Sequence, residues 1–189
     1  MNGEKKERIR KIVKERLKEI SPTERKEKSI KITEFLLTHP FYLERDIVMV
    51  YLPLPEEVDT FPFIKKAITQ GKKILVPWVK GEELIPVKLL SLRKLKEGRW
   101  GIPEPVEKVL FSKKEIQLVI TPGLAFDRRG NRLGRGKGYF DRFFTSLPEG
   151  VKKIGLAFHV QIFEEIPVDS QDVPVDEVIT EYGYLLNKF

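Results

Sequence analysis

Residues 121–141 combine glycine, cationic and aromatic residues at a spacing suited to phosphate binding. The apolar run 118–120 before them ends at Thr121-Pro122, which predicts a buried strand that delivers its carboxyl end to a loop. The loop carries cations between glycines, namely Gly123, Arg128, Arg129, Gly130, Arg132, Gly134, Arg135, Gly136, Lys137 and Gly138. Glycines let backbone N–H groups approach an anion, and the helical pattern that begins at Tyr139 adds a positive helix end. The pattern therefore predicts a phosphate site; a flexible basic loop is the alternative with the same composition.

Residues 121–141, called the glycine segment below, match neither common nucleotide-binding fingerprint. The run 134–138 lacks the Lys-Ser/Thr ending of a Walker A loop. It also lacks the glycine spacing of a dinucleotide-binding turn and lies too late in the chain for one. Any phosphate site here is therefore of another type.

A second group of cations lies on a predicted amphipathic basic helix over residues 5–20. Its apolar stripe comprises Ile9, Ile12, Val13, Leu17 and Ile20. Lys6 and Arg10 are four residues apart and share a face that borders this stripe. Cations at the edge of a buried stripe can reach a neighbouring pocket, which makes both residues candidate phosphate ligands. The remaining cations of the helix, Lys11, Lys14 and Lys18, are expected to point into solvent.

The elements that must position these residues alternate between helix and strand. Predicted strands cover 47–52, 73–78, 84–88, 118–120 and 153–158, with a further strand edge within 172–180. Helices are predicted from the Ser21-Pro22 cap to Leu37, through 63–68, and after Gly138. This alternation predicts a three-layer α/β/α sandwich with a mainly parallel sheet. Strands that end at Leu52, Trp78 and Thr121 would then meet at one sheet edge, where such folds bind ligands.

Composition limits the class of protein. The 189 residues, 41% of them hydrophobic, predict a single domain over residues 1–189. No stretch reaches the length of a membrane span, and the charged start has no signal-peptide core. The absence of cysteine excludes disulfide and thiol chemistry and favours a cytoplasmic protein. His39 and His159, the two histidines, lack carboxylate or cysteine at ligand spacing, so both are expected to be structural.

The positive charge is concentrated at the N-terminus. Residues 1–31 hold twelve Lys and Arg against six Glu, and thereby most of the net charge of +7. Such a segment either binds nucleic acid or directs cations at a small anionic ligand. The glutamates between the cations argue against nucleic acid.

The segments PGLAFD and GNRLGRGKGYFD resemble the signature of the 5-formyltetrahydrofolate cyclo-ligase family, also called methenyltetrahydrofolate synthetases. The similarity extends to the first helix, to Glu57–Thr60 and to Val173–Thr180. It implies ATP- and Mg²⁺-dependent closure of 5-formyltetrahydrofolate to 5,10-methenyltetrahydrofolate, with ADP and phosphate released. The formyl oxygen would first be phosphorylated, and N10 would then attack the activated carbon. The resemblance also implies a small-molecule substrate, no nucleic-acid or membrane partner, and a monomer.

The resemblance further implies the roles of individual residues. The implied ATP-binding residues are Lys6, Arg10, Arg132, Leu133, Gly134, Arg135, Gly136, Lys137, Gly138, Tyr139 and Phe140. The implied catalytic residues are Arg135, Lys137 and Tyr139. The implied folate-binding residues are Leu52, Glu57, Trp100, Arg135 and Tyr139. The implied metal ligands are Asp141 and Asp176, with Asp127 a weaker candidate that would equally suit a turn.

One departure from the family pattern and two rival functions accompany this prediction. Many family members have Tyr-Tyr-Asp where this chain has Tyr139-Phe140-Asp141, so a second hydroxyl is absent here while aromatic packing is kept. One rival is a nucleic-acid-binding module that uses the basic helix and the arginine-rich loop. The other is a different ATP-dependent ligase or kinase, which only the long motif disfavours.

Overall fold

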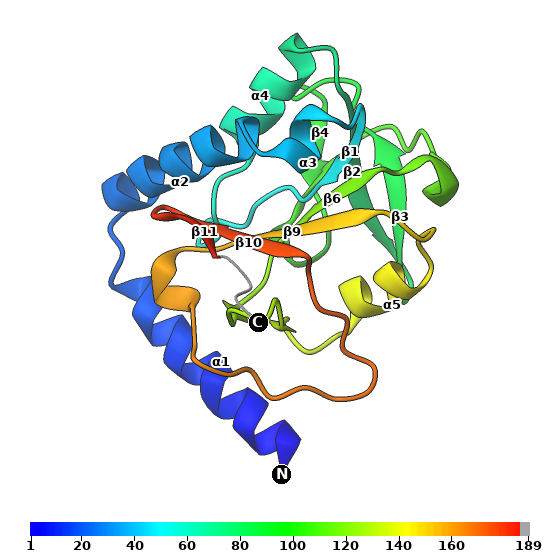
Figure 1. Ribbon diagram of the computed structural model, residues 1–189. Coiled ribbons are helices and arrows are strands. Elements are labelled where there is room, and N and C mark those ends of the chain that lie inside the picture. The colour runs from blue at the N-terminus through cyan, green and yellow to red at the C-terminus, as the bar shows by residue number, and fades with distance from the viewer. Residues whose placement is uncertain (186–189) are drawn as a thin grey trace.

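Seven strands form one sheet in the order β11-β10-β9-β6-β1-β2-β3 (Figure 1), in a computed structural model that describes residues 1–185. The strands are β1 (Ile47–Val50), β2 (Lys73–Lys80), β3 (Glu83–Lys88), β6 (Leu118–Thr121), β9 (Lys152–Leu156), β10 (Glu177–Thr180) and β11 (Gly183–Leu185). The central strands from β10 to β2 run parallel, whereas β3 and β11 are antiparallel edge strands. The predicted, mainly parallel sheet is confirmed.

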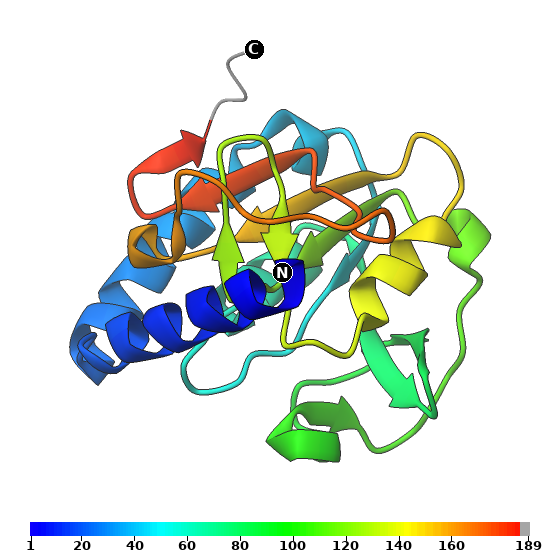
Figure 2. The same cartoon turned by 90° about the horizontal axis from the view of Figure 1, so that it is seen from below.

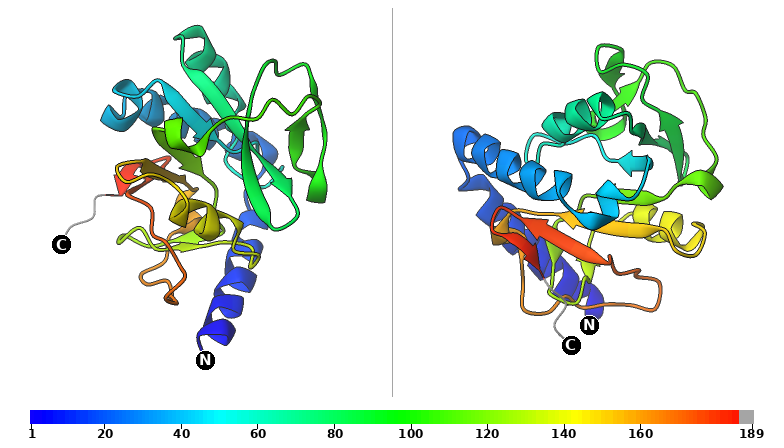
Figure 3. Two further views of the ribbon diagram at one scale, coloured as in Figure 1. Left: turned by 90° about the vertical axis from the view of Figure 1, so that its right-hand side faces the viewer. Right: turned by 45° about the horizontal axis from the view of Figure 1, so that its top comes forward.

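Helices cover both faces of this sheet, which confirms the predicted layers (Figure 3). The helices are α1 (Asn2–Lys18), α2 (Pro22–Leu37), α3 (Pro40–Leu43), α4 (Phe61–Thr69) and α5 (Tyr139–Thr145), with short 3-10 turns η1 (Arg99–Gly101), η2 (Lys113–Glu115) and η3 (His159–Gln161). The start of α2 is fixed as its sequence predicts, because the Ser21 side chain accepts a hydrogen bond from the backbone N–H of Glu24. No helix in residues 1–185 is long and apolar enough to cross a membrane.

The core lies on both faces of the sheet and follows the alternation of the strands. Val48 and Val50 of β1 belong to the apolar cluster that includes residues of α1, α2 and α4. Met49, between them, belongs to the opposite cluster with Phe143 and Phe144 of α5. Strands buried on both faces need apolar residues at every position, which explains the continuous run in β1.

The order of the strands reverses between β1 and β6. From β1 the chain continues to β2 on one side, and later returns to β6 on the other side. Open α/β sheets bind ligands at the carboxyl ends of the strands beside such a reversal. Leu52 and Pro122, which follow β1 and β6, line a cavity there. Trp78, predicted at the same edge, lies instead within β2, which continues to Lys80.

The glycine segment is more structured than a single loop. It contains an unpredicted hairpin of β7 (Ala125–Phe126) and β8 (Arg132–Leu133), followed by residues 134–138 and then α5. A second unpredicted hairpin pairs β4 (Leu95–Glu97) with β5 (Pro103–Pro105). Figure 2 shows α1 passing across the β7–β8 hairpin, so the first helix and the glycine segment lie together despite their distance in the sequence.

Candidate active site

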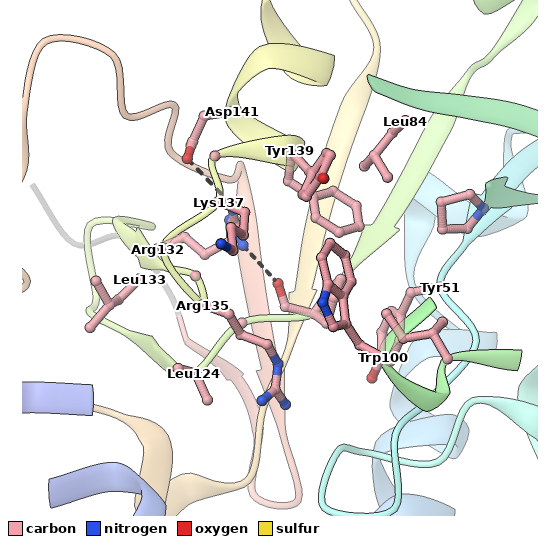
Figure 4. Close-up of a pocket in the computed structure, with 18 of the residues that line it drawn as sticks. Tyr51, Leu84, Trp100, Leu124, Arg132, Leu133, Arg135, Lys137, Tyr139 and Asp141 are labelled. Carbon is pink, nitrogen blue, oxygen red and sulfur yellow. Dashed lines mark hydrogen bonds and ion pairs between the residues drawn. The ribbon is translucent and has the colours of Figure 1, made fainter. Parts of the chain in front are cut away.

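A cavity of about 1470 Å³ opens where the sheet order reverses (Figure 4). Its walls come from α1, the loops after β1 and β6, the glycine segment, the β4–β5 hairpin and residues 169–172. Pockets for one small molecule usually measure about 300–1000 Å³. The volume is therefore large enough for two ligands side by side.

The glycines of residues 134–138 form one wall of the cavity. Gly136 and Gly138 have φ values of 103° and 69°, in the left-handed region that favours glycine. At both positions the positive φ would strain a residue that carries a side chain, so the turn into α5 favours glycine. These residues keep bare backbone at the cavity surface, as a phosphate site requires.

Asp127 holds the turn of the β7–β8 hairpin. One carboxylate oxygen accepts hydrogen bonds from the backbone N–H groups of Arg129 and Asn131. The other accepts from Nδ2 of Asn131 and the N–H of Ile166. The buried side chain has its oxygens engaged and does not line the cavity. Its geometry is that of a turn-forming acid rather than a metal ligand.

The buried Arg132 pairs with the partly exposed Asp141 in the wall of the cavity. Nη2 of Arg132 lies 3.5 Å from Oδ2 of Asp141, and Nη1 donates to the carbonyl of Pro122. Its Nε is buried without a partner in residues 1–185. Burial lowers the pKa of Arg132, while Asp141 and Asp172 oppose this shift. The guanidinium is therefore a cation held in place, with one N–H donor that has no partner in residues 1–185.

The two predicted cations of α1 both reach the cavity. Nε of Arg10 donates to the carbonyl of Gly134 at 3.0 Å, which ties α1 to the glycine segment. Nζ of Lys6 lies 2.7 Å from Oδ2 of Asp169 and also bonds Oδ2 of Asp172. Burial lowers the pKa of Lys6, but the bonds to the two aspartates outweigh this effect and raise the pKa overall. Lys6 is thus a permanent cation held between carboxylates.

Glu57 is a buried carboxylate in the cavity wall that the loop after β1 forms. Its Oε1 lies 3.5 Å from Nη2 of Arg135, which also pairs with Glu56 at 2.9 Å. Its Oε2 is buried and has no hydrogen-bond partner in the described chain. Burial raises the pKa of Glu57 to about 7, and Arg135 only partly opposes the rise. An unpartnered buried oxygen is costly and indicates a place for a ligand donor.

Aromatic and apolar side chains complete the cavity. The rings of Trp100 and Tyr139 lie 5.7 Å apart, and the Tyr139 hydroxyl donates to the carbonyl of Gly81. Trp100 is about half exposed, and it is the one non-glycine residue with positive φ in residues 1–185. Leu52 and Phe140 also line the cavity, and Phe140 packs against the Arg132 guanidinium. Lys137 lines it without an ion pair in the described chain.

The structure brings only one of the two predicted metal ligands to the cavity. Asp141 lies in its wall, with Oδ1 accepting from the N–H of Val173. Asp176 precedes β10, at the amino edge of the parallel sheet, where its carboxylate binds the backbone N–H and Nζ of Lys153. It does not line the cavity. No cluster of three or more His, Cys, Asp or Glu within residues 1–185 forms a complete protein-only metal site.

Asp172 and Asp169 are cavity residues that the sequence did not reveal. Asp172 directly precedes Val173, whose N–H binds Asp141, so the carboxylates of Asp141 and Asp172 share one region of the wall. Both also act on the charge of Arg132. They lie in an irregular segment, and no periodic pattern shows which of its acids faces Lys6.

Comparison with known proteins agrees with the fold and the motif. A sequence model of the 5-formyltetrahydrofolate cyclo-ligase family matches residues 2–181. The chain is 33% identical to the mouse 5-formyltetrahydrofolate cyclo-ligase over 186 residues, covering 92% of each chain. An NMR structure of Aquifex aeolicus 5,10-methenyltetrahydrofolate synthetase superimposes with a TM-score of 0.85 at 34% identity, covering 97% of this chain and 93% of that one.

A more distant structure has the same fold. The 5,10-methenyltetrahydrofolate synthetase from Mycoplasma pneumoniae superimposes with a TM-score of 0.77 at 24% identity, covering 93% of this chain and 98% of that one. The family match, the identity to the mouse enzyme and the Aquifex structure all extend over nearly the whole chain. On these grounds, the chain belongs to the 5-formyltetrahydrofolate cyclo-ligase family of enzymes.

Proposed function

We propose that this chain uses MgATP to convert 5-formyltetrahydrofolate to 5,10-methenyltetrahydrofolate, and that both substrates bind in the 1470 Å³ cavity. The observation that supports this most is the position of Arg135. Arg135 belongs to the glycine wall, which suits phosphate, and its side chain extends to Glu57, whose unpartnered oxygen suits the N–H donors of a folate. Arg135 thus borders both the region suited to phosphate and the region suited to folate.

ATP would lie along the glycine wall. Lys6, Arg10, Arg132, Lys137 and the backbone of residues 133–140 surround this region. Phosphoryl transfer depends on positioning and on neutralising charge on the oxygens that move. Arg132 and Arg10 are held by the carbonyls of Pro122 and Gly134, so their charges need little reorganisation. Lys6 would exchange a carboxylate partner for a phosphate.

The folate would lie against Trp100, Tyr139 and Leu52, with Glu57 at the polar end of this region. The γ-phosphoryl group would pass to the formyl oxygen, which converts a poor amide electrophile into an activated iminium. N10 would then attack the formyl carbon and lose its proton, and the carbon–oxygen bond to phosphate would break. Arg135 and Lys137 would stabilise the charge on the transferred group, with Tyr139 beside it.

The carboxylates present fit a magnesium ion bound mainly through substrate phosphates. Mg²⁺ commonly uses one or two protein carboxylates together with phosphate oxygens and water. Asp141 and Asp172 would hold it, since both lie in the cavity wall. When bound, the ion would neutralise phosphate charge. Asp172 pairs with Lys6, so its carboxylate would become available to the ion when Lys6 turns to a phosphate.

The proposal is tested by incubating the protein with MgATP and 5-formyltetrahydrofolate. We expect the methenyl chromophore and ADP to form in equal amounts, and neither to form without ATP or with a chelator. Turnover that is independent of divalent metal, or absent with well-folded protein and fresh substrate, would refute it. Excess mixed RNA should not inhibit at moderate salt; tight competition would favour the nucleic-acid rival.

A further inference from the structure

The turn between β2 and β3 does not line the cavity, yet it contacts two of the elements that do. The turn consists of Gly81 and Glu82. The carbonyl of Gly81 accepts two hydrogen bonds, one from the hydroxyl of Tyr139 and one from Nη1 of Arg99, both at 3.0 Å. A carbonyl oxygen has two lone pairs, so both bonds can form at once. The turn therefore joins the start of α5 to η1, which lies between β4 and β5.

Arg142 makes a second connection between α5 and the same turn. Its Nη2 donates to the carbonyl of Glu82 and its Nη1 to the carbonyl of Lys137, each at 2.8 Å. Its Cζ also lies 5.1 Å from the ring centroid of Tyr139, a cation–π distance. The planar fork of an arginine can hold two carbonyls in a fixed relation. Arg142 thus holds the backbone at Lys137 and the ring of Tyr139 against the β2–β3 turn.

Arg99 supports Trp100 on the other side of the turn. Cζ of Arg99 lies 4.7 Å from the ring centroid of Trp100, whose backbone has a φ of 57°. This conformation is uncommon for a residue with a side chain and persists only where surrounding contacts fix it. The Trp100 ring is about half exposed, so packing alone holds it weakly. The bond from Arg99 to the turn is therefore one of the contacts that keep Trp100 5.7 Å from Tyr139 (Figure 4).

The two arginines act on neutral carbonyls rather than on acids. Within residues 1–185, neither Arg99 nor Arg142 has a carboxylate within ion-pair distance. Replacing either one therefore leaves no acid without its cation. Arg142 lines the cavity, whereas Arg99 does not. Any effect of Arg99 on turnover must accordingly pass through the groups that it holds.

We propose that Arg99 and Arg142 are positioning residues, which act through the β2–β3 turn to fix the Trp100 side of the cavity relative to the glycine wall. This inference rests on the proposed function, which assigns folate to the first region and phosphate to the second. A transferred group moves readily when the reacting atoms lie about 3–3.5 Å apart, and a misplacement of about 1 Å can slow the reaction about a hundred-fold. Two walls held by one turn keep that separation constant.

The test measures kcat and both KM values for Arg99→Gln and Arg142→Gln. Each change should lower kcat about ten-fold, with KM for ATP and for 5-formyltetrahydrofolate altered less than about three-fold. The double variant should lose about as much as the worse single variant, because either change already releases the turn. A raised KM for ATP at unchanged kcat would show that Arg142 binds the nucleotide directly and would overturn the assignment, as would independent effects that multiply.

Lysine variants separate positioning from the mere presence of charge. Arg99 uses one nitrogen toward the turn, so Arg99→Lys should recover most of kcat. Arg142 uses two nitrogens toward two carbonyls, so Arg142→Lys should recover little. Equal recovery at the two positions would indicate that charge alone matters and would overturn the proposal.

Arg16 of α1 offers a matched control. It is also exposed, its Nη1 donates to the carbonyl of Val160, and its Cζ lies 4.6 Å from the ring centroid of Phe163. It does not line the cavity. Arg16→Gln should therefore leave kcat and both KM values unchanged. If it lowers kcat as much as Arg99→Gln does, with the same fall in melting temperature, the effect is one of stability and the proposal is wrong.

A measurement without turnover keeps this test separate from the test of the reaction. In a Trp78→Phe background, Trp100 is the single tryptophan, and acrylamide quenching of its fluorescence reports its exposure. Arg99→Gln should increase the quenching constant, and Arg16→Gln should leave it unchanged. An unchanged quenching constant in Arg99→Gln would overturn this inference. Wild-type protein that fails to form the methenyl product would instead refute the proposed function.

Discussion

Arg135 and Glu57, separated by 78 residues in the sequence, meet across the cavity with Nη2 of the arginine 3.5 Å from Oε1 of the glutamate. The contact is too long to satisfy a buried carboxylate, and burial raises the pKa of Glu57 to about 7. The folded protein therefore holds at this position a group that can accept or donate a proton near neutral pH.

Glu57 should make stability depend on pH. Between its ordinary pKa of 4.5 and its folded pKa of about 7, the folded protein keeps a proton that the unfolded chain has lost. The free energy of unfolding should therefore fall as pH rises through this range, by at most about 3 kcal/mol from this group. Glu57→Gln should remove that component and raise KM for the folate. Parallel pH profiles of thermal unfolding for the two proteins would contradict it.

The metal requirement should distinguish three aspartates. Asp141→Asn and Asp172→Asn should each raise the Mg²⁺ concentration for half-maximal turnover by about ten-fold or more, since even outer-shell partners of a metal have effects of that size. Asp176→Asn is the control, because its carboxylate binds Lys153 outside the cavity. Mn²⁺ binding in the presence of ATP gives a second readout. A larger effect at Asp176 than at Asp172 would reverse the assignment.

The cations of α1 should differ in their effect on ATP. Lys6→Ala and Arg10→Ala should each weaken ATP use by roughly ten- to a thousand-fold, the scale of losing one charge-stabilising donor. Lys5→Ala and Arg8→Ala, at exposed positions of the same helix, should have little effect. The measurement is kcat/KM for ATP with the monoglutamyl folate. Indifference to all four changes would leave phosphate binding to the glycine segment alone.

Phe140 should act through packing. Its ring lies against the Arg132 guanidinium and 5.9 Å from Phe144, and these contacts do not use a hydroxyl. Phe140→Tyr should therefore leave turnover within a few-fold and the melting temperature nearly unchanged. A large change in either direction at unchanged stability would show that the site distinguishes the hydroxyl.

The parts of the fold that follow local rules could be predicted from the sequence. The cap at Ser21 fixes the start of α2, and the unbroken apolar run of β1 required a sheet covered on both faces. Lys6 and Arg10 border the apolar stripe of α1, and this position predicted that both side chains reach a ligand pocket, as they do. Each of these inferences needed only neighbours within a few turns of the chain.

The contacts that could not be predicted are long-range or lie in irregular backbone. Lys6 meets Asp169 from 163 residues away, and no periodicity marks that pairing. Asp172 lines the cavity, whereas Asp176 does not. Asp172 lies in an irregular loop, and Asp176, four residues later, directly precedes β10 at the amino ends of the parallel strands. Trp78 was misplaced because a strand longer than predicted changes which residue ends it.

The buried turn at Asp127 limits how much conformational entropy ligand binding must remove. Four hydrogen bonds to one carboxylate fix the tip of the β7–β8 hairpin, and Arg10 secures its far end at Gly134. The following stretch is held as well, because Arg142 donates to the carbonyl of Lys137 and Arg135 pairs with Glu56. At about 1–2 kcal/mol per residue for fixing backbone, ordering the whole segment from 121 to 141 would cost about 20–40 kcal/mol, which exceeds the roughly 8–12 kcal/mol of micromolar to nanomolar binding. The backbone of this segment is instead ordered during folding, before a substrate binds.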